Sequence, residues 1–164
     1  MNNETLGLAK RVGFLLKEKG LTIAVAESLT SGYLQAAIGS ISGSSAYYLG
    51  GVTAYTPWSK EALLGVDRDL LVRTNCVDIE VADGMAKGVA KMFQADIGIG
   101  TTGYAEPDPG RGIHAPMACW AIYNPGEIEP IRGGGEFSKR ATRIRVQEGV
   151  TSTVLSLLLL SLGE

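Results

Sequence analysis

Residues 21–32 read LTIAVAESLTSG, and this stretch decides the fold. An apolar, β-branched run up to Val25 ends abruptly in small hydroxyl residues and Gly32, and a helical pattern follows from Tyr33 to Ile38. The pattern predicts a strand, a tight turn and a helix N-terminus at the carboxyl edge of a sheet. Hydroxyl groups and free backbone N–H groups at such a turn suit an anion or a nucleophile. A serine-rich loop with an ordinary helix cap is the alternative interpretation.

The sequence on either side of this stretch alternates between helical and strand-like patterns. Helices are predicted from about residue 6 to a stop at Gly20 and over 31–38, 56–65, 78–93 and 140–162. Strands are predicted over 22–26, within 47–55, and over 95–101, 116–123 and 128–137. A loop is predicted over 102–116. This order predicts an α/β fold: a three-layer α/β/α sandwich with a mixed sheet, parallel at first and ending in an antiparallel hairpin. Since no linker or internal repeat divides the sequence, we assign residues 1–164 to a single domain.

Composition restricts the class of protein. A hydrophobic fraction of 45% is typical of a globular protein, and a net charge of −2 argues against non-specific binding to nucleic acid. Cys76 and Cys119 have no metal or disulfide spacing, which favours a reduced, cytoplasmic setting, and His114 is the one histidine. Residues 1–20 lack a signal-peptide core, and the apolar stretch 154–162 is too short to span a bilayer. We therefore expect no membrane association, and expect 154–162 to be buried in the core or in an oligomer contact.

Residues 98–103 read GIGTTG and match the spacing of the dinucleotide-binding fingerprint. In that fingerprint a helix begins at the glycines and holds the pyrophosphate at its N-terminus. Here residues 104–109 read YAEPDP, and two prolines so placed break a helix. The sequence therefore argues against dinucleotide binding, and leaves Thr101 and Thr102 as hydroxyl donors at the end of a strand.

Lys60 is a candidate general base. Thr56 and Pro57 are a typical cap and first residue of a helix, so Lys60 is predicted in its first turn. The positive helix end and partial burial would both lower the pKa of the lysine, and a neutral amine can accept a proton from a serine hydroxyl. The alternative is a solvated surface lysine beside Glu61.

Two further groups of polar residues are candidates for binding a ligand. Residues 41–46 read ISGSSA and predict a flexible, hydroxyl-rich loop. Four basic residues lie near the predicted start of the last helix, where an arginine could grip a phosphate with two hydrogen bonds. They are Lys139, Arg140, Arg143 and Arg145. A solvated helix face is the alternative for at least two of the four.

Taken together, these motifs resemble the CinA C-terminal domain family. The resemblance rests on Glu27-Ser28-x-Thr30-x-Gly32, Gly43-Ser44-Ser45-Ala46-Tyr47, Gly51-Val52-x-x-Tyr55-x-x-x-x-Lys60, Leu64-Gly65-Val66, the helix opened by Asp78, Thr102-Gly103-x-Ala105-x-Pro107 and the segment 137–145. Typical members are nicotinamide-nucleotide amidohydrolases, which hydrolyse the carboxamide of nicotinamide mononucleotide to nicotinate mononucleotide and ammonia. The resemblance implies an α/β/α sandwich that forms a homo-oligomer, binds a nucleotide, and uses no metal or other cofactor.

The resemblance also implies roles for particular residues. Ser28 would attack the carboxamide carbon, Lys60 would take its proton, and Tyr55 would orient Lys60 or the pyridine ring. Ser45 is a second possible nucleophile, and we prefer Ser28 because it lies on the tight turn. Substrate-binding residues would be Thr30, Ser31, Gly32, Ser44, Ser45, Thr102, Gly103, Arg140 and Arg143.

This chain departs from the family pattern where the substrate phosphate is expected. Glu106 replaces a glycine and would repel a phosphate, and Ala141 replaces an arginine, although Arg111, Arg140 or Arg143 could restore that contact. We therefore expect slow hydrolysis of nicotinamide mononucleotide, or none. Two functions follow. One is a Ser–Lys amidohydrolase acting on nicotinamide mononucleotide or a related amide, and the other is a non-catalytic paralogue that binds a nucleotide or regulates.

Overall fold

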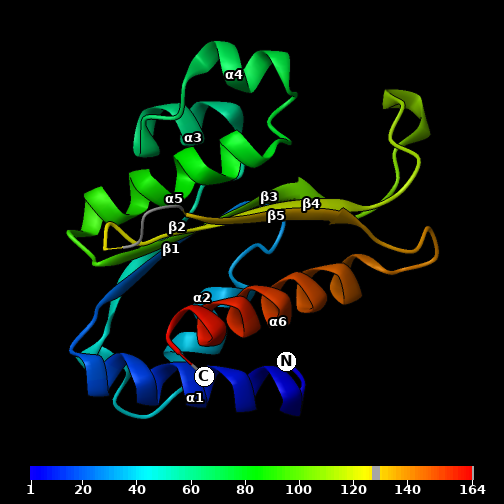
Figure 1. The fold of residues 1–164 in the computed structure, drawn as a ribbon. Coiled ribbons are helices and arrows are strands. Elements are labelled where there is room, and N and C mark those ends of the chain that lie inside the picture. The colour runs from blue at the N-terminus through cyan, green and yellow to red at the C-terminus, as the bar shows by residue number, and fades with distance from the viewer. Residues whose placement is uncertain (127–129, 164) are drawn as a thin grey trace.

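The structure is a computed structural model that describes residues 1–126 and 130–163. These residues form a five-stranded mixed sheet with helices on both faces, in the strand order β2-β1-β3-β4-β5 (Figure 1). The strands are β1 (Ile23–Glu27), β2 (Tyr48–Thr53), β3 (Ile97–Tyr104), β4 (Met117–Tyr123) and β5 (Ile131–Glu136). β1 pairs in parallel with β2 and β3, whereas β3, β4 and β5 are antiparallel. The predicted α/β/α sandwich with a mixed sheet is confirmed.

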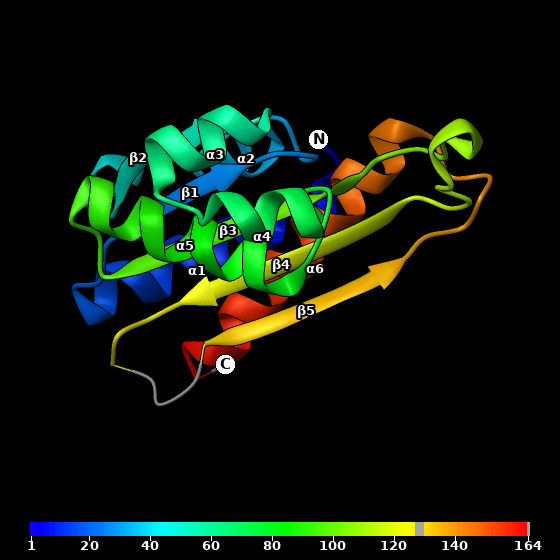
Figure 2. The ribbon, with the colours of Figure 1, turned by 90° about the horizontal axis from the view of Figure 1, so that it is seen from above.

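The helices divide between the two faces of the sheet (Figures 1 and 2). On one face lie α1 (Asn3–Lys19), α2 (Tyr33–Gly39) and α6 (Arg143–Ser161); on the other lie α3 (Pro57–Leu64), α4 (Arg68–Arg73) and α5 (Ile79–Phe93). Two short 3₁₀ turns, η1 (Ser44–Ala46) and η2 (Pro109–Arg111), interrupt the loops. Among the described residues, no helix combines the length and the apolar character needed to cross a membrane.

Strand β1 is buried along its whole length and separates two apolar cores. Ile23 and Val25 pack with α1, α2 and α6, whereas Ala24 and Ala26 pack toward α5. This alternation is the period of two that a strand imposes on its side chains. The sequence stretch that predicted the fold therefore also forms its centre.

The glycines of GIGTTG serve packing. A Cβ added to Gly98 or Gly100 would collide with the backbone oxygens of Ala86 and Ala82 in α5. Glycine at these two positions of β3 therefore lets α5 lie directly on the sheet. No helix begins after them, because β3 continues to Tyr104, in agreement with the argument against dinucleotide binding.

Two strand predictions were imperfect at their ends. β3 runs to Tyr104 instead of ending at Thr101, because residues 102–104 pair with β4. The predicted strand 128–137 is shorter as β5, and its residues 128 and 129 lie outside the described residues.

Three helix predictions also need correction. α4 was not predicted, since its six residues show too little periodicity. α2 begins at Tyr33, because Ser31 and Gly32 have left-handed backbone with φ of 50° and 99°. α6 begins at Arg143, where the Thr142 side chain accepts a hydrogen bond from the backbone N–H of Arg145.

Candidate active site

The carboxyl ends of β1, β2 and β3 meet at one edge of the sheet, where ligand sites of open α/β sheets usually form. A cavity of about 510 Å³ opens there. It is lined by Ser28, Leu29, Tyr55, Pro57, Lys60, Asn75, Cys76, Val77, Thr102, Gly103, Tyr104, Ala105, Glu106, Pro107, Asp108, Arg111, Ile113 and Arg143.

Glu27 holds the turn that presents Ser28. Its fully buried carboxylate accepts hydrogen bonds from the backbone N–H groups of Gly32, Leu34 and Gln35, at 3.0, 3.1 and 2.8 Å. A carboxylate at this place satisfies the free N–H groups of the α2 N-terminus and complements the helix dipole. The backbone N–H of Ser28 itself donates to the carbonyl of Thr101 at 3.0 Å, which ties the turn to β3.

Lys60 is buried beside Ser28. A capping box between Thr56 and Ser59, with Pro57 at the first helical position, fixes the start of α3 and directs Lys60 inward. The Lys60 side chain is 1% exposed, and its Nζ lies 2.9 Å from Ser28 Oγ. The alternative of a solvated surface lysine is wrong.

Two backbone carbonyls orient the Lys60 amine. Nζ donates to the carbonyl oxygen of Ala54 at 2.9 Å and to that of Tyr55 at 3.4 Å. Burial lowers the pKa of Lys60 from its ordinary value of 10.5, against an opposing influence of the Cys76 thiol. Carbonyls can only accept, so in the neutral amine they hold the two N–H groups and leave the lone pair for the hydroxyl of Ser28. This arrangement suits a general base acting on a serine nucleophile.

Three predicted binding residues of the β1–α2 turn do not line the cavity. Thr30 is fully buried, and its hydroxyl lies 2.7 Å from that of Thr101. Gly32 donates its backbone N–H to Glu27, and Ser31 is exposed to solvent away from the cavity lining. The structure does not bring these three residues into the cavity lining, because their polar groups hold the turn or face elsewhere.

Ser44 and Ser45 lie at the opposite edge of the sheet. Both belong to η1, which precedes the first residue of β2, whereas the cavity lies beyond the last residues of the parallel strands. Neither residue lines the cavity. Ser45, the second possible nucleophile, therefore does not share the cavity with Ser28 and Lys60, and the geometry favours Ser28 as the nucleophile.

The wall facing Ser28 comes from β3 and from the turn before α5. Thr102 lines the cavity and donates its hydroxyl hydrogen to the carbonyl of Cys76 at 2.7 Å, and Gly103 follows it. Asn75 and Cys76 both adopt left-handed backbone, with φ of 49° and 64°. Asn75 Nδ2 donates to the hydroxyl of Tyr104 at 2.6 Å. Consecutive non-glycine residues in this conformation store strain, which is often found at functional sites.

Charged side chains form the rim of the cavity. Arg143 Nη2 lies 2.6 Å from Glu106 Oε1, and this hydrogen bond raises the pKa of the Arg143 guanidinium. Arg111 Nη2 donates to Asn75 Oδ1 at 3.1 Å. Arg140, in contrast, is exposed outside the cavity lining. Of the two arginines predicted to bind substrate, the structure brings only Arg143 to the cavity, and there it already has a partner.

Sequence reasoning missed Asn75, Cys76 and Tyr104 as lining residues. The sequence predicts a loop at Tyr104, because the apolar run ends before it, whereas pairing with Met117 of β4 extends β3 to this residue. The one local signal was Asn75, since asparagine tolerates left-handed backbone better than most residues.

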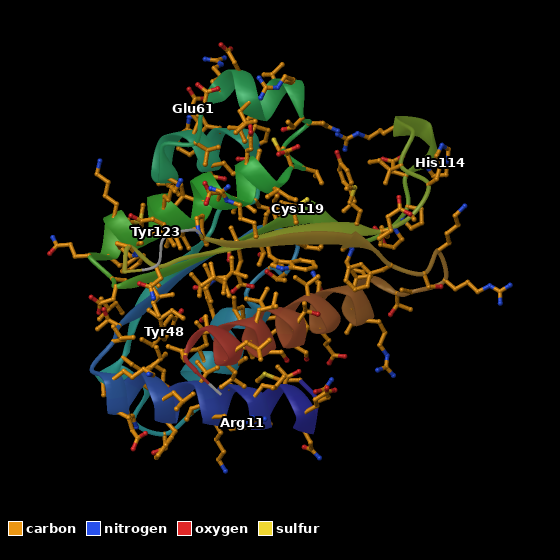
Figure 3. All side chains as sticks on the ribbon, viewed as in Figure 1. Arg11, Tyr48, Glu61, His114, Cys119 and Tyr123 are labelled. Carbon is orange, nitrogen blue, oxygen red and sulfur yellow. The ribbon has the colours of Figure 1, made fainter. Side chains whose placement is uncertain are left out.

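Two residues considered earlier, His114 and Cys119, lie apart from the cavity. His114 is exposed on the loop beyond the end of β3 and does not line the cavity (Figure 3). Cys119 is buried in β4, and burial raises the pKa of its thiol to about 11. In the part of the chain that the structure describes, no three His, Cys, Asp or Glu side chains gather in a way that could hold a metal ion.

The fold and this edge of the sheet define an α/β/α protein of the CinA type. The CinA C-terminal domain family matches residues 5–162, and the chain belongs to this family. A protein of Desulforamulus reducens, named as competence-damage inducible, is 40% identical over 134 residues, which are 75% of this chain and 33% of that protein. A CinA-like protein of Chlorobium limicola is 45% identical over 105 residues, 64% of this chain and 24% of its own length. The chain thus spans a third or less of these curated relatives.

Solved structures agree over the whole fold. A competence or damage-inducible protein from Enterobacter asburiae superposes with a TM-score of 0.90 at 29% identity, covering 99% of this chain and 100% of its own. A CinA superfamily protein from Klebsiella pneumoniae gives a TM-score of 0.88 at 28% identity, covering 99% and 98%. The resemblance seen in the sequence motifs is therefore confirmed at the level of the family and the fold.

Proposed function

We propose that this protein is an amidohydrolase that uses Ser28 as nucleophile and Lys60 as general base. The observation that supports this most directly is the 2.9 Å approach of Lys60 Nζ to Ser28 Oγ, made by a lysine that is 1% exposed. Among the described residues no carboxylate pairs with Lys60, so no ion pair opposes the loss of its proton.

In the proposed reaction Ser28 Oγ attacks the carboxamide carbon while its proton passes to the Lys60 amine. The C–N bond then breaks, and the Lys60 ammonium returns a proton to the leaving nitrogen, which departs as ammonia. Water attacks the resulting acyl ester of Ser28 with Lys60 as base. The carboxylic acid leaves and the serine hydroxyl is restored.

The proposed substrate is nicotinamide mononucleotide or a related carboxamide. A cavity of about 510 Å³ is of the size that small-molecule sites have. Tyr55, whose side chain is 55% exposed at the rim, and Tyr104 offer aromatic surfaces to a pyridine ring. We further propose that the protein is cytoplasmic, forms a homo-oligomer and needs no cofactor.

The experiment is an ammonia-release assay over a panel of carboxamides that includes nicotinamide mononucleotide, its nucleoside and free nicotinamide. Wild-type protein should release ammonia from at least one of them, and Ser28→Ala should release none. Electrospray mass of protein quenched during turnover should show an acyl adduct that Ser28→Ala lacks. Equal rates for the wild type and Ser28→Ala would refute the mechanism.

A second candidate function is a non-catalytic nucleotide-binding or regulatory module. The observation that favours it is the Glu106–Arg143 ion pair, which occupies one of the two arginines that line the cavity. Ligand binding without ammonia release from any carboxamide of the panel would support this second function.

A further inference from the structure

Two guanidinium groups reach the rim of the cavity, and they are held differently. Arg143, at the first residue of α6, pairs with Glu106 from the loop after β3. Arg111, in η2, contacts the neutral amide oxygen of Asn75. The two guanidinium groups therefore differ in how readily each can bind an anionic part of a substrate.

Arg143 is already neutralised. Its Nη2 lies 2.6 Å from Glu106 Oε1, in a short charge-assisted hydrogen bond. A phosphate that approached Arg143 would have to displace this carboxylate or lie against it as a like charge. With side chains 41% and 55% exposed, the pair contributes little to folding stability, so its consequence lies in what the cavity accepts.

Arg111 does not give the rim a positive field. Asp108 lines the same cavity from the same loop, three positions before Arg111. The carboxylates of Glu106 and Asp108 therefore equal in number the guanidinium groups of Arg111 and Arg143. With Lys60 neutral, as a general base must be, the ionisable groups lining the cavity sum to no net charge, which is unsuited to a dianionic phosphate.

We propose that Glu106 fills, from within the chain, the position that a substrate anion would take at Arg143, and that the site therefore selects an aromatic carboxamide whose remaining part has no phosphate. A nucleoside or a free ring amide fits this description, whereas a nucleotide does not. This inference rests on the proposed function for the identity of the amide, and it names the class of substrate.

The test measures binding by titration calorimetry in the Ser28→Ala background, where ligand is not consumed. The probes are nicotinamide riboside and nicotinamide mononucleotide, which differ only in the phosphate. We expect the mononucleotide to bind at least roughly tenfold more weakly. Adding Glu106→Gln, which keeps the shape and removes the charge, should shift the ratio of the two Kd values toward the mononucleotide by at least roughly tenfold.

A matched control is Asp108→Asn, which removes one negative charge from the same loop without releasing Arg143. It should shift the ratio by less than about threefold, because exposed charges that make no direct contact are screened. Adding Arg143→Gln to Glu106→Gln should cancel the gain in mononucleotide binding. Equal shifts from Glu106→Gln and Asp108→Asn would overturn the inference, as would mononucleotide binding as tight as that of the riboside, or no binding of either probe.

Ammonia release by protein that retains Ser28 separates this inference from the proposed function. The expected ratio of Kd values without ammonia from either probe would leave the inference standing and refute the Ser–Lys reaction for these amides. Ammonia release with the mononucleotide preferred would support the reaction and overturn the inference.

Discussion

The floor and the rim of the cavity are built in different ways. Ser28 and Lys60 form the floor, and Glu27 holds the turn that carries Ser28. All three are at most 6% exposed, and each forms hydrogen bonds inside the protein. At the rim, Glu106 and Arg143 extend into solvent and hold each other across two segments that are far apart in sequence. The comparison indicates that the reaction and the choice of substrate depend on separate parts of the molecule, which can be changed separately.

The largest effect is expected from Lys60→Met at the floor. Methionine replaces the buried stem with similar volume but cannot accept a proton, so kcat/KM for ammonia release should fall by about 10²–10⁴-fold. Steady-state kinetics on the best carboxamide of the panel would measure the loss. Circular dichroism and the urea midpoint would check that the variant is folded.

Ser45→Ala is the matched control for Ser28→Ala, since it removes a serine hydroxyl at the opposite edge of the sheet. Its activity should stay close to that of the wild type. A collapse of activity in this variant, with Ser28→Ala retaining turnover, would show that the nucleophile has been assigned to the wrong edge.

The next effect concerns the stability of the floor. Glu27→Ala leaves three backbone N–H groups of the β1–α2 turn without their acceptor, and should lower the free energy of unfolding by on the order of 3 kcal/mol or more. Urea denaturation would measure it. Glu80→Ala, at the first turn of α5 but largely exposed, should cost less than about 1 kcal/mol. Similar losses for the two variants would contradict the role given to Glu27.

The pH dependence tests the state of Lys60. Burial lowers its pKa below 10.5, so kcat/KM should rise with pH through the lowered pKa as the amine becomes neutral. Stability changes in the same direction. Because the unfolded chain keeps this proton up to pH 10.5, the free energy of unfolding rises between the folded pKa and 10.5, by about 1.4 kcal/mol per pH unit inside that window. Below the folded pKa the full cost of burying the ammonium is present.

Lys60→Met provides the reference for that measurement. Urea denaturation from neutral to alkaline pH would give the free energy of unfolding of each protein. The value for the wild type minus the value for Lys60→Met should rise with pH in this window. A difference that is flat with pH would mean that Lys60 titrates as an ordinary lysine.

The sequence predicted the floor because each of its features is local. An apolar run that ends in hydroxyl residues predicts a strand and a turn at Ser28, and Thr56 with Pro57 predicts where the helix of Lys60 begins. Topology could have corrected the prediction for Ser45. In a β–α–β unit with parallel strands the chain returns to the amino edge before the second strand, which places any residue just before β2 away from Ser28.

The rim could not be predicted in this way. Glu106 and Arg143 are 37 positions apart, and their contact depends on the conformation of the loop after β3 and on α6 beginning at Arg143. The basic residues near the end of the chain gave no signal to separate Arg143 from Arg140, because a shift of a few residues in the helix start decides which arginine faces the cavity.

The smallest effect is expected on folding stability when the ion pair between Glu106 and Arg143 is removed. A double-mutant cycle with Glu106→Gln and Arg143→Gln should give a coupling in unfolding free energy below about 1 kcal/mol, because both side chains are partly exposed. The coupling should weaken further at high salt, which screens exposed charges. A coupling of several kcal/mol that does not weaken at high salt would show that the ion pair stabilises the fold. Glu106 would then bear on substrate choice through the shape of its loop, and the distinction between floor and rim would fail at this contact.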